Sequence, residues 1–190
     1  METTASKTIA LGILSFVTTN VDDFLLLLLL FSTQRVKIAP IVTGQFLGIL
    51  LLVIISDFIG LVGSQIIPPS HIKLLGVLPV LLGILEFTRE KRALNPSSEL
   101  HNRSLLISTT ILTLSGGVDN IAVYVPLFIR HSLVQKTILL STFLVMTGIW
   151  CYLAFLSARS GFISGPMNYI GKRAYPLGLL ALGVYILFFQ

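Results

Sequence analysis

The first membrane-length apolar stretch of the chain reads TIALGILSFVTTNVDDFLLLLLLF, residues 8–31. Two adjacent carboxylates, Asp22 and Asp23, interrupt this stretch near its middle. A charged side chain at the centre of a membrane helix costs roughly 2.5–3.5 kcal/mol on insertion scales, and such residues mark ion or substrate pathways. The stretch therefore predicts a membrane helix that carries part of a functional site.

A second stretch, SLLISTTILTLSGGVDNIAVYVPLFI at residues 104–129, repeats this pattern. Its carboxylate, Asp119, lies 97 residues after Asp22 (119 − 22). The same offset matches further pairs along the chain, namely Phe31 with Phe128, Phe46 with Phe143, and Pro79 with Pro176. We interpret residues 1–95 and 96–190 as two related halves of a single membrane domain.

The composition agrees with a membrane protein. Of the 190 residues 54% are hydrophobic and only 11% are charged, whereas soluble domains are about 25% charged. The net charge of +5 does not indicate a nucleic-acid partner, because the basic residues fall in short loops between apolar segments, the pattern that sets membrane orientation. The single cysteine, Cys151, excludes an intrachain disulfide or dithiol redox pair.

About 20 apolar residues are needed to cross a bilayer as a helix, and we expect six crossings. The segments are Thr8–Phe31, Ala39–Gly63, Ile72–Phe87, Ser104–Ile129, Leu133–Ser157 and Ala174–Phe189. The hydrophilic stretch Thr88–Arg103 is expected to connect the halves, whereas Ser157–Arg173 reads equally as a loop or an interfacial segment. Three crossings per half force the halves into opposite orientations, as in many secondary transporters. The sequence thus predicts an all-α integral membrane protein with six transmembrane helices as two inverted three-helix repeats.

The basic residues predict the orientation, because cytoplasmic loops carry an excess of Lys and Arg. Loops one, three and five carry nine of the thirteen: Arg35, Lys37, Arg89, Lys91, Arg92, Arg103, Arg159, Lys172 and Arg173. The amino end with loops two and four carries four: Lys7, Lys73, Arg130 and Lys136. We therefore expect both termini outside.

Polar residues gather around both intramembrane carboxylates, and glycines Gly116 and Gly117 weaken the helix just before Asp119. Lys73 and Lys136 lie at the ends of their segments and are counted with the loops, and no Lys or Arg lies deeper in a span to pair with Asp22 or Asp119. We therefore expect the partner of these carboxylates to be a cation or a proton. The candidate metal ligands are Asp22, Asp119, Asp23, Asn20 and Asn120, with Asp57, Gln45, Thr19 and Ser115 as accessory candidates. Helix-to-helix hydrogen bonding is the alternative role of the threonines and Ser115.

Four motifs, in this order along the chain, resemble the cadmium resistance transporter family of the lysine exporter superfamily. They read Thr19-Asn20-Val21-Asp22-Asp23, Gly44-Gln45-Phe46-Leu47-Gly48, Leu74-Leu75-Gly76-Val77-Leu78-Pro79 and Ser115-Gly116-Gly117-Val118-Asp119-Asn120. The resemblance implies a six-helix exporter, not an enzyme, that removes divalent cations such as Cd²⁺ from the bacterial cytoplasm through the inner membrane. Some relatives carry a cysteine where this chain has Gly116. Oxygen ligands suit harder ions such as Mn²⁺, so the identity of the exported cation stays open.

The leading hypothesis is a secondary exporter of a divalent cation, with no resident cofactor. Two nearby carboxylates repel each other, so at least one is expected to hold a proton until the cation displaces it. The partners considered are the lipid bilayer, the cation, protons as counter-ion and a second copy of the chain in a homodimer. The alternatives are an exporter of amino acids or other organic cations, as in the wider superfamily, a redox carrier, which Cys151 alone cannot support, and a non-transporting structural subunit.

Overall fold

The computed structural model describes residues 2–32, 37–66, 68–88, 105–160, 177, 180, 181 and 183–188. These residues form helices and no strand, which confirms the all-α class. The elements are α1 (Glu2–Thr19), α2 (Val21–Ser32), α3 (Ile38–Ile66), the 3-10 helix η1 (Pro69–Gly76), α4 (Val77–Thr88), α5 (Leu105–Gly116), α6 (Val118–Arg130) and α7 (Leu133–Ser160).

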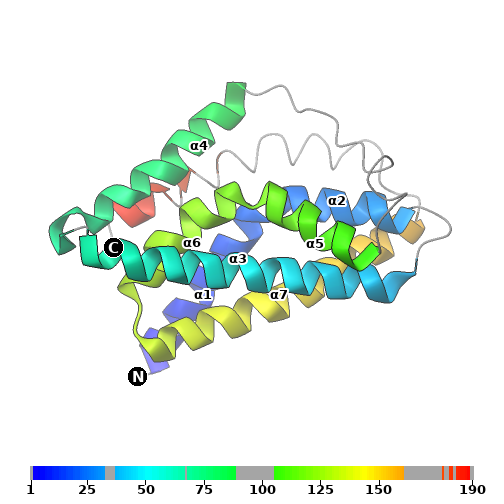
Figure 1. The fold of residues 1–190 in the computed structure, drawn as a ribbon, viewed down its shortest axis with the longest axis horizontal. Helices are drawn as coiled ribbons and strands as arrows, with labels where there is room; N and C mark the ends of the chain where they lie inside the picture. The colour runs from blue at the N-terminus through cyan, green and yellow to red at the C-terminus, as the bar shows by residue number, and fades with distance from the viewer. Residues whose placement is uncertain are drawn as a thin grey trace.

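Two long helices run the length of the molecule (Figure 1). Helix α3 has 29 residues and α7 has 28, and both are apolar enough to cross a membrane. At about 1.5 Å per residue each extends roughly 42 Å, more than the hydrocarbon core requires. They correspond to the second and fifth segments expected from the sequence.

The first and fourth expected segments are not continuous helices. Helices α1 and α2 meet at a bend of 60°, and α5 and α6 at a bend of 69°. The breaks fall at Asn20 and Gly117, which are separated by the same 97 residues as the two aspartates (117 − 20). The glycine pair predicted the second break, whereas no glycine or proline marks the first. If each bent pair is one span, the described part of the chain holds four candidate membrane spans.

The third and sixth expected segments are not found as candidate membrane spans among the described residues. Segment Ile72–Phe87 begins within η1 and continues as the 12-residue α4, which is not among the candidate spans. Of Ala174–Phe189 the structure describes residues 177, 180, 181 and 183–188, all of them helical. The rest of this segment, the expected connector at 89–103 and residues 161–173 lie outside the described residues. The six-crossing arrangement therefore remains a prediction.

Each long helix packs beside a broken pair from the other half of the chain. Helix α3 contacts α5 and α6, and α7 contacts α1 and α2. Glycines on α3 allow the close approach to α5: a Cβ added at Gly44 would lie 2.6 Å from the carbonyl oxygen of Leu106, and one at Gly48 would lie 2.6 Å from the Cβ of Thr113. Two small residues four positions apart, such as Gly44 and Gly48, commonly allow membrane helices to pack this closely.

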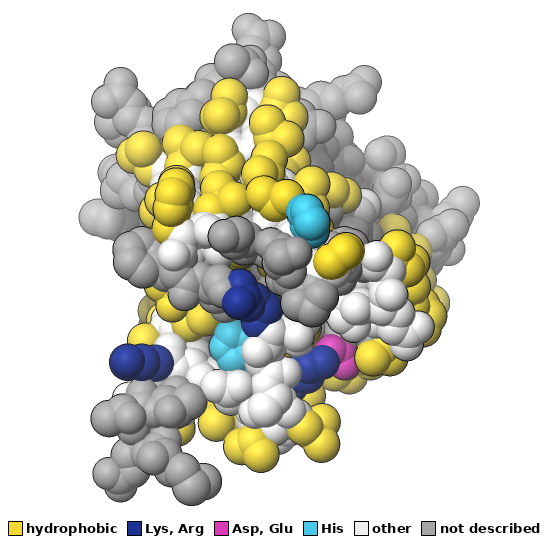
Figure 2. Space-filling view, turned by 90° about the vertical axis from the view of Figure 1, so that its left-hand side faces the viewer, with side chains coloured by type: hydrophobic (Ala, Val, Ile, Leu, Met, Phe, Trp, Pro, Cys, Tyr) yellow, Lys and Arg dark blue, Asp and Glu magenta, His cyan; other side chains and the backbone are white. Residues whose placement is uncertain are grey.

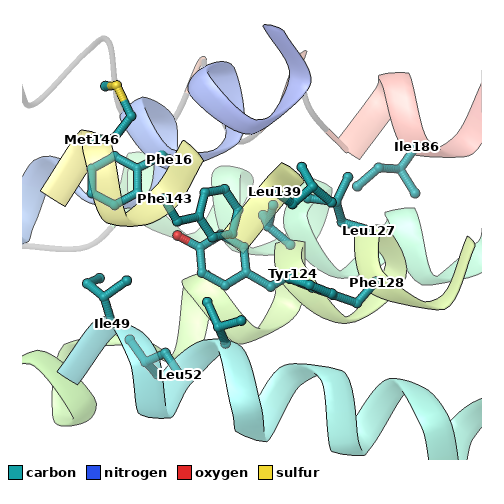
Figure 3. Packing of buried hydrophobic residues seen from close by; sticks show 12 residues of the cluster. Phe16, Ile49, Leu52, Tyr124, Leu127, Phe128, Leu139, Phe143, Met146 and Ile186 are labelled. Carbon is teal, nitrogen blue, oxygen red and sulfur yellow. The ribbon is translucent and has the colours of Figure 1, made fainter. Parts of the chain in front are cut away.

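Aromatic side chains fill the centre of the bundle (Figure 3). Tyr124 stacks on Phe143 with ring centroids 4.5 Å apart, and Phe16 packs against Phe143 at 6.0 Å. Large apolar side chains also lie exposed on the outside, for example Phe58 (64%) and Leu133 (81%). A protein surrounded by lipid does not pay for such exposure, since the bilayer core is as apolar as these side chains.

One end of the molecule carries polar side chains. Figure 2 views the left-hand end of Figure 1, where α3 and α6 end and α7 begins, and shows Lys, Arg and His side chains together over it. The amino-terminal helix starts at this end as well (Figure 1). The amino end and loops two and four thus share one side, as the count of basic residues assumed.

Candidate functional site

The two breaks place carboxylates at the starts of helices. Asp22 and Asp23 lie in the first turn of α2, and Asp119 lies in the first turn of α6. The unpaired N–H groups of a helix start carry positive partial charge, which stabilises a carboxylate there by about 0.3–1 kcal/mol in exposed sites and more when partly buried. Breaking the two helices therefore lowers the cost of holding these charges at membrane depth.

A cavity of about 130 Å³ lies where the breaks meet. It is lined by Asp22, Asp23 and Leu26 of the first half and by Leu112, Ser115 and Gly116 of the second. The backbone of the second half comes close to the first carboxylate, because a Cβ added at Gly116 would lie 3.2 Å from Asp22 Oδ2. The predicted residues Asp22, Asp23 and Ser115 are thus brought together.

Asp119 is buried, with 6% of its surface exposed, and does not line this cavity. It nevertheless lies close enough to Asp23 for the two charges to interact, as do the charges of Asp22 and Asp23. The carboxylates of both halves therefore belong to one electrostatic cluster centred on Asp23, which is itself only 3% exposed.

Asp23 is held by a chain of hydrogen bonds that crosses three helices. Gln45 on α3 donates from Nε2 to Asp23 Oδ2 at 2.7 Å, and Gln45 Oε1 accepts from Thr113 Oγ1 on α5 at 2.7 Å. The hydroxyl of Thr113 thereby fixes which end of the amide faces the carboxylate. Gln45, an accessory ligand candidate, serves here as a donor to Asp23, and Thr113 was missed because threonines are frequent in this segment.

Asn20 is fully buried at the first break. Its Nδ2, which carries two hydrogens, lies within hydrogen-bond distance of three acceptors: the carbonyl of Phe16 at 2.9 Å, Thr19 Oγ1 at 3.0 Å and the hydroxyl of Tyr124 at 3.0 Å. The backbone carbonyl oxygen of Asn20 accepts a hydrogen bond from Trp150 Nε1 at 2.7 Å. Thr19, predicted as an accessory ligand, supports Asn20 and also donates to the carbonyl of Ser15 at 3.0 Å.

The side-chain oxygens of Asn20 and Asn120 share an unusual environment. Both residues are buried, at 0% and 2% exposed, and neither Oδ1 accepts a hydrogen bond from any residue that the structure describes. A buried polar atom without a partner costs about 1–3 kcal/mol, so each native example requires an explanation such as an ion or ordered water. In the sequence, Asn20 lies two residues before Asp22, and Asn120 directly follows Asp119.

Asp57 has a different setting from the other candidates. Its Oδ1 forms an ion pair with Lys136 Nζ at 2.6 Å. It lies twelve residues beyond Gln45 on the continuous helix α3, which at about 1.5 Å per residue is about 18 Å along the axis. The structure therefore does not bring Asp57 to the cavity.

The donor set around the breaks consists of oxygens. Within the described ranges, no three His, Cys, Asp or Glu side chains gather in a geometry that could hold a metal. A cation here would need amide, hydroxyl or backbone oxygens in addition to carboxylates, a combination typical of sites for hard divalent cations. Cys151 is buried and forms no disulfide.

Tyr124 and Trp150 are not among the residues predicted from the sequence. The only sign of Trp150 is that it is the single tryptophan of the chain, and Tyr124 falls in an otherwise apolar run. Their role arises from contacts across 104 and 130 residues of sequence.

A family model described as "Cadmium resistance transporter" matches residues 16–190, nearly the whole chain. No curated protein and no solved structure matches the chain.

Proposed function

We propose that this chain, which belongs to the cadmium resistance transporter family, is a secondary transporter that exports a divalent metal cation through the site at the two helix breaks. Membership of a transporter family and the apolar helices support a membrane transport protein rather than an enzyme. One observation carries the assignment of the site. Asp22 and Asp23 of the first half line one cavity with Ser115 and Gly116 of the second. Asn20 and Asn120, which neighbour the aspartates in the sequence, add buried side-chain oxygens to which no described residue donates, and we propose that the cation uses them.

The carboxylates would couple cation movement to protons. Asp22, Asp23 and Asp119 form one cluster, and close carboxylates in a poorly solvated place do not all ionise together. An arriving cation favours the ionised forms and releases the proton, whereas a returning proton weakens the hold on the cation. Exchange in opposite directions follows from this competition.

The element boundaries support two inverted halves. Helices α2 and α6 begin at Val21 and Val118, again 97 residues apart (118 − 21), and each follows a bend of similar angle. Each long helix packs against the broken pair of the opposite half, so the two halves use the same contacts reciprocally. In transporters with inverted repeats, discontinuous helices form the substrate site between the halves.

The size of the cavity supports a small substrate. Its volume of about 130 Å³ corresponds to about four water molecules at about 30 Å³ each. That space accommodates a cation with part of its hydration shell. The oxygen ligands would serve Cd²⁺, which the family name suggests, and would suit a harder ion such as Mn²⁺ better.

Metal flux in vesicles containing the purified protein tests the proposal. Asp22→Asn and Asp119→Asn keep the shape of each side chain and remove its charge, so each is expected to abolish flux of Cd²⁺ and Mn²⁺ without loss of membrane insertion. Asp57→Asn is the matched control, because Asp57 lies about 18 Å along α3 from Gln45, and it should retain most of the flux. Near-normal flux in both single variants would exclude the proposed site.

A further inference from the structure

Tyr124 is a buried polar residue that connects the two helix breaks. It lies on α6, five residues after Asp119 (124 − 119), and its hydroxyl oxygen accepts a hydrogen bond from Asn20 Nδ2, at the first break, at 3.0 Å. The hydroxyl of Thr19 lies within 3.4 Å of the same oxygen. The phenol is thus a contact between the second broken helix and the end of the first.

The ring of Tyr124 is fixed in place by its packing. The side chain has no exposed surface, and its ring stacks on Phe143 with an interplanar angle of 26°. Figure 3 shows Tyr124 within the hydrophobic cluster, between Phe143 and the residues of α3. A ring held in this way gives its hydroxyl oxygen a defined position.

These contacts decide which way the Asn20 amide points. Its Nδ2 faces three acceptors, the Phe16 carbonyl, Thr19 Oγ1 and the Tyr124 hydroxyl. Rotating the amide by half a turn would place Oδ1 against the carbonyl oxygen of Phe16, where two acceptors repel. The oxygen therefore stays on the side away from this network, where no described residue donates to it.

Trp150 fixes the backbone of the same residue. Its Nε1 donates to the Asn20 carbonyl at 2.7 Å, and its ring packs edge-on against Phe16 and Phe24 on either side of the break. Helix α7 thereby holds the backbone at Asn20 in its bent form. Tyr124 on α6 thus fixes the side chain of Asn20, and Trp150 on α7 fixes its backbone.

We infer that Tyr124 and Trp150 are positioning residues that hold the Asn20 side-chain oxygen ready for the transported cation. This inference rests on the proposed function and assigns roles to two residues outside the ligand set. Neither is required to touch the cation: Tyr124 acts through the amide nitrogen, and Trp150 acts through the backbone. Pre-oriented ligands bind more tightly because less ordering remains to be done on binding.

Tyr124→Phe removes the hydroxyl and keeps the stacked ring, and flux of Mn²⁺ and Cd²⁺ into vesicles measures its effect. We expect the KM for the cation to rise about three- to tenfold, which corresponds to the loss of one neutral hydrogen bond. The maximal rate should stay within about twofold of wild type. Tyr152→Phe on α7 is the matched control, since Tyr152 is 62% exposed, and it should leave both constants unchanged. An unchanged KM in Tyr124→Phe would overturn the inference.

A double variant separates positioning from general packing. If Tyr124 acts through Asn20, adding Tyr124→Phe to Asn20→Ala should raise the KM no further than Asn20→Ala alone, since the two changes remove the same interaction. If Tyr124→Phe raises the KM in the Asn20→Ala background as much as it does in the wild type, the inference is contradicted.

Trp150→Phe decides the matter should Tyr124→Phe fail to reach the membrane. It removes the indole N–H and keeps an aromatic ring, so a raised KM supports the inference and an unchanged KM overturns it. Failure of the proposed function is distinguishable, because wild-type protein would then carry no divalent cation at all.

Discussion

At the scale of single residues, the site depends on the absence of a side chain as much as on the presence of carboxylates. Gly116 lines the cavity, and its backbone comes so close to Asp22 that even one added carbon would lie 3.2 Å from the carboxylate oxygen. A larger residue there would occupy part of this cavity, the space that we propose for the cation. The role of Gly116 is therefore spatial as well as conformational.

Gly116→Ala is expected to raise the KM for the transported cation severalfold, because Asp22 must move by a few tenths of an ångström and ligand geometry tolerates shifts of only about 0.5 Å. Gly148→Ala is the control, since its added carbon would meet Phe46 at 3.7 Å, an ordinary contact. Flux measured over a range of cation concentrations gives both constants. Equal KM values for the two variants would show that the space beside Asp22 is not used.

At the scale of helices, α3 and α7 are joined directly by the ion pair between Asp57 and Lys136. The two side chains are 45% and 24% exposed, respectively, so water screens the attraction and the pair contributes about 0.2–1 kcal/mol. Its place near the end of α3 and the start of α7 makes it a link between the two halves of the chain at one end of the molecule.

Charge reversal tests whether this link is structural. Asp57→Lys alone places two positive charges together and should lower the unfolding temperature in detergent, whereas Asp57→Lys combined with Lys136→Asp should restore it. The cation KM should stay near the wild-type value in the double variant, because neither residue lies at the cavity. A large loss of cation affinity despite restored stability would instead assign Asp57 to the transport path.

At the scale of the whole molecule, the proposed inversion has a consequence for topology. If each half crosses the membrane three times, both chain ends lie on one side and the connector at residues 89–103 lies on the other. The distribution of basic residues places the ends outside and the connector in the cytoplasm.

Reporter fusions check this topology. A reporter that is active only outside the cytoplasm should be active when fused after Gln190 and inactive when inserted within residues 89–103, and a reporter active only in the cytoplasm should show the reverse. Activity of the same reporter at both positions would mean an even number of crossings per half and would rule out inverted halves. The opposite pattern at both positions would keep the inversion and reverse the orientation.

The sequence by itself determined the class of protein and the family, and it singled out Asp22 and Asp119 as candidate site residues. Apolar segments of membrane length are visible locally because the bilayer imposes one requirement on every residue of a span. Asp22 and Asp119 were conspicuous for the same reason, since a carboxylate in an apolar run is costly wherever the chain folds. The glycine pair at Gly116 and Gly117 also indicated the second break, because glycine has a low helix propensity.

Only the tertiary structure decided which hydrogen-bond partners the polar residues have and which of them lie at the cavity. No glycine or proline marks the break at Asn20 in the sequence. The break coincides with hydrogen bonds from Trp150 and to Tyr124, which lie more than 100 residues away. Gln45 became a donor to Asp23 through Thr113, and Asp57 was separated from the cavity by its place on α3. Hydrogen-bond partners depend on which helix faces come together, and an apolar sequence in a membrane specifies its spans more strongly than the packing between them.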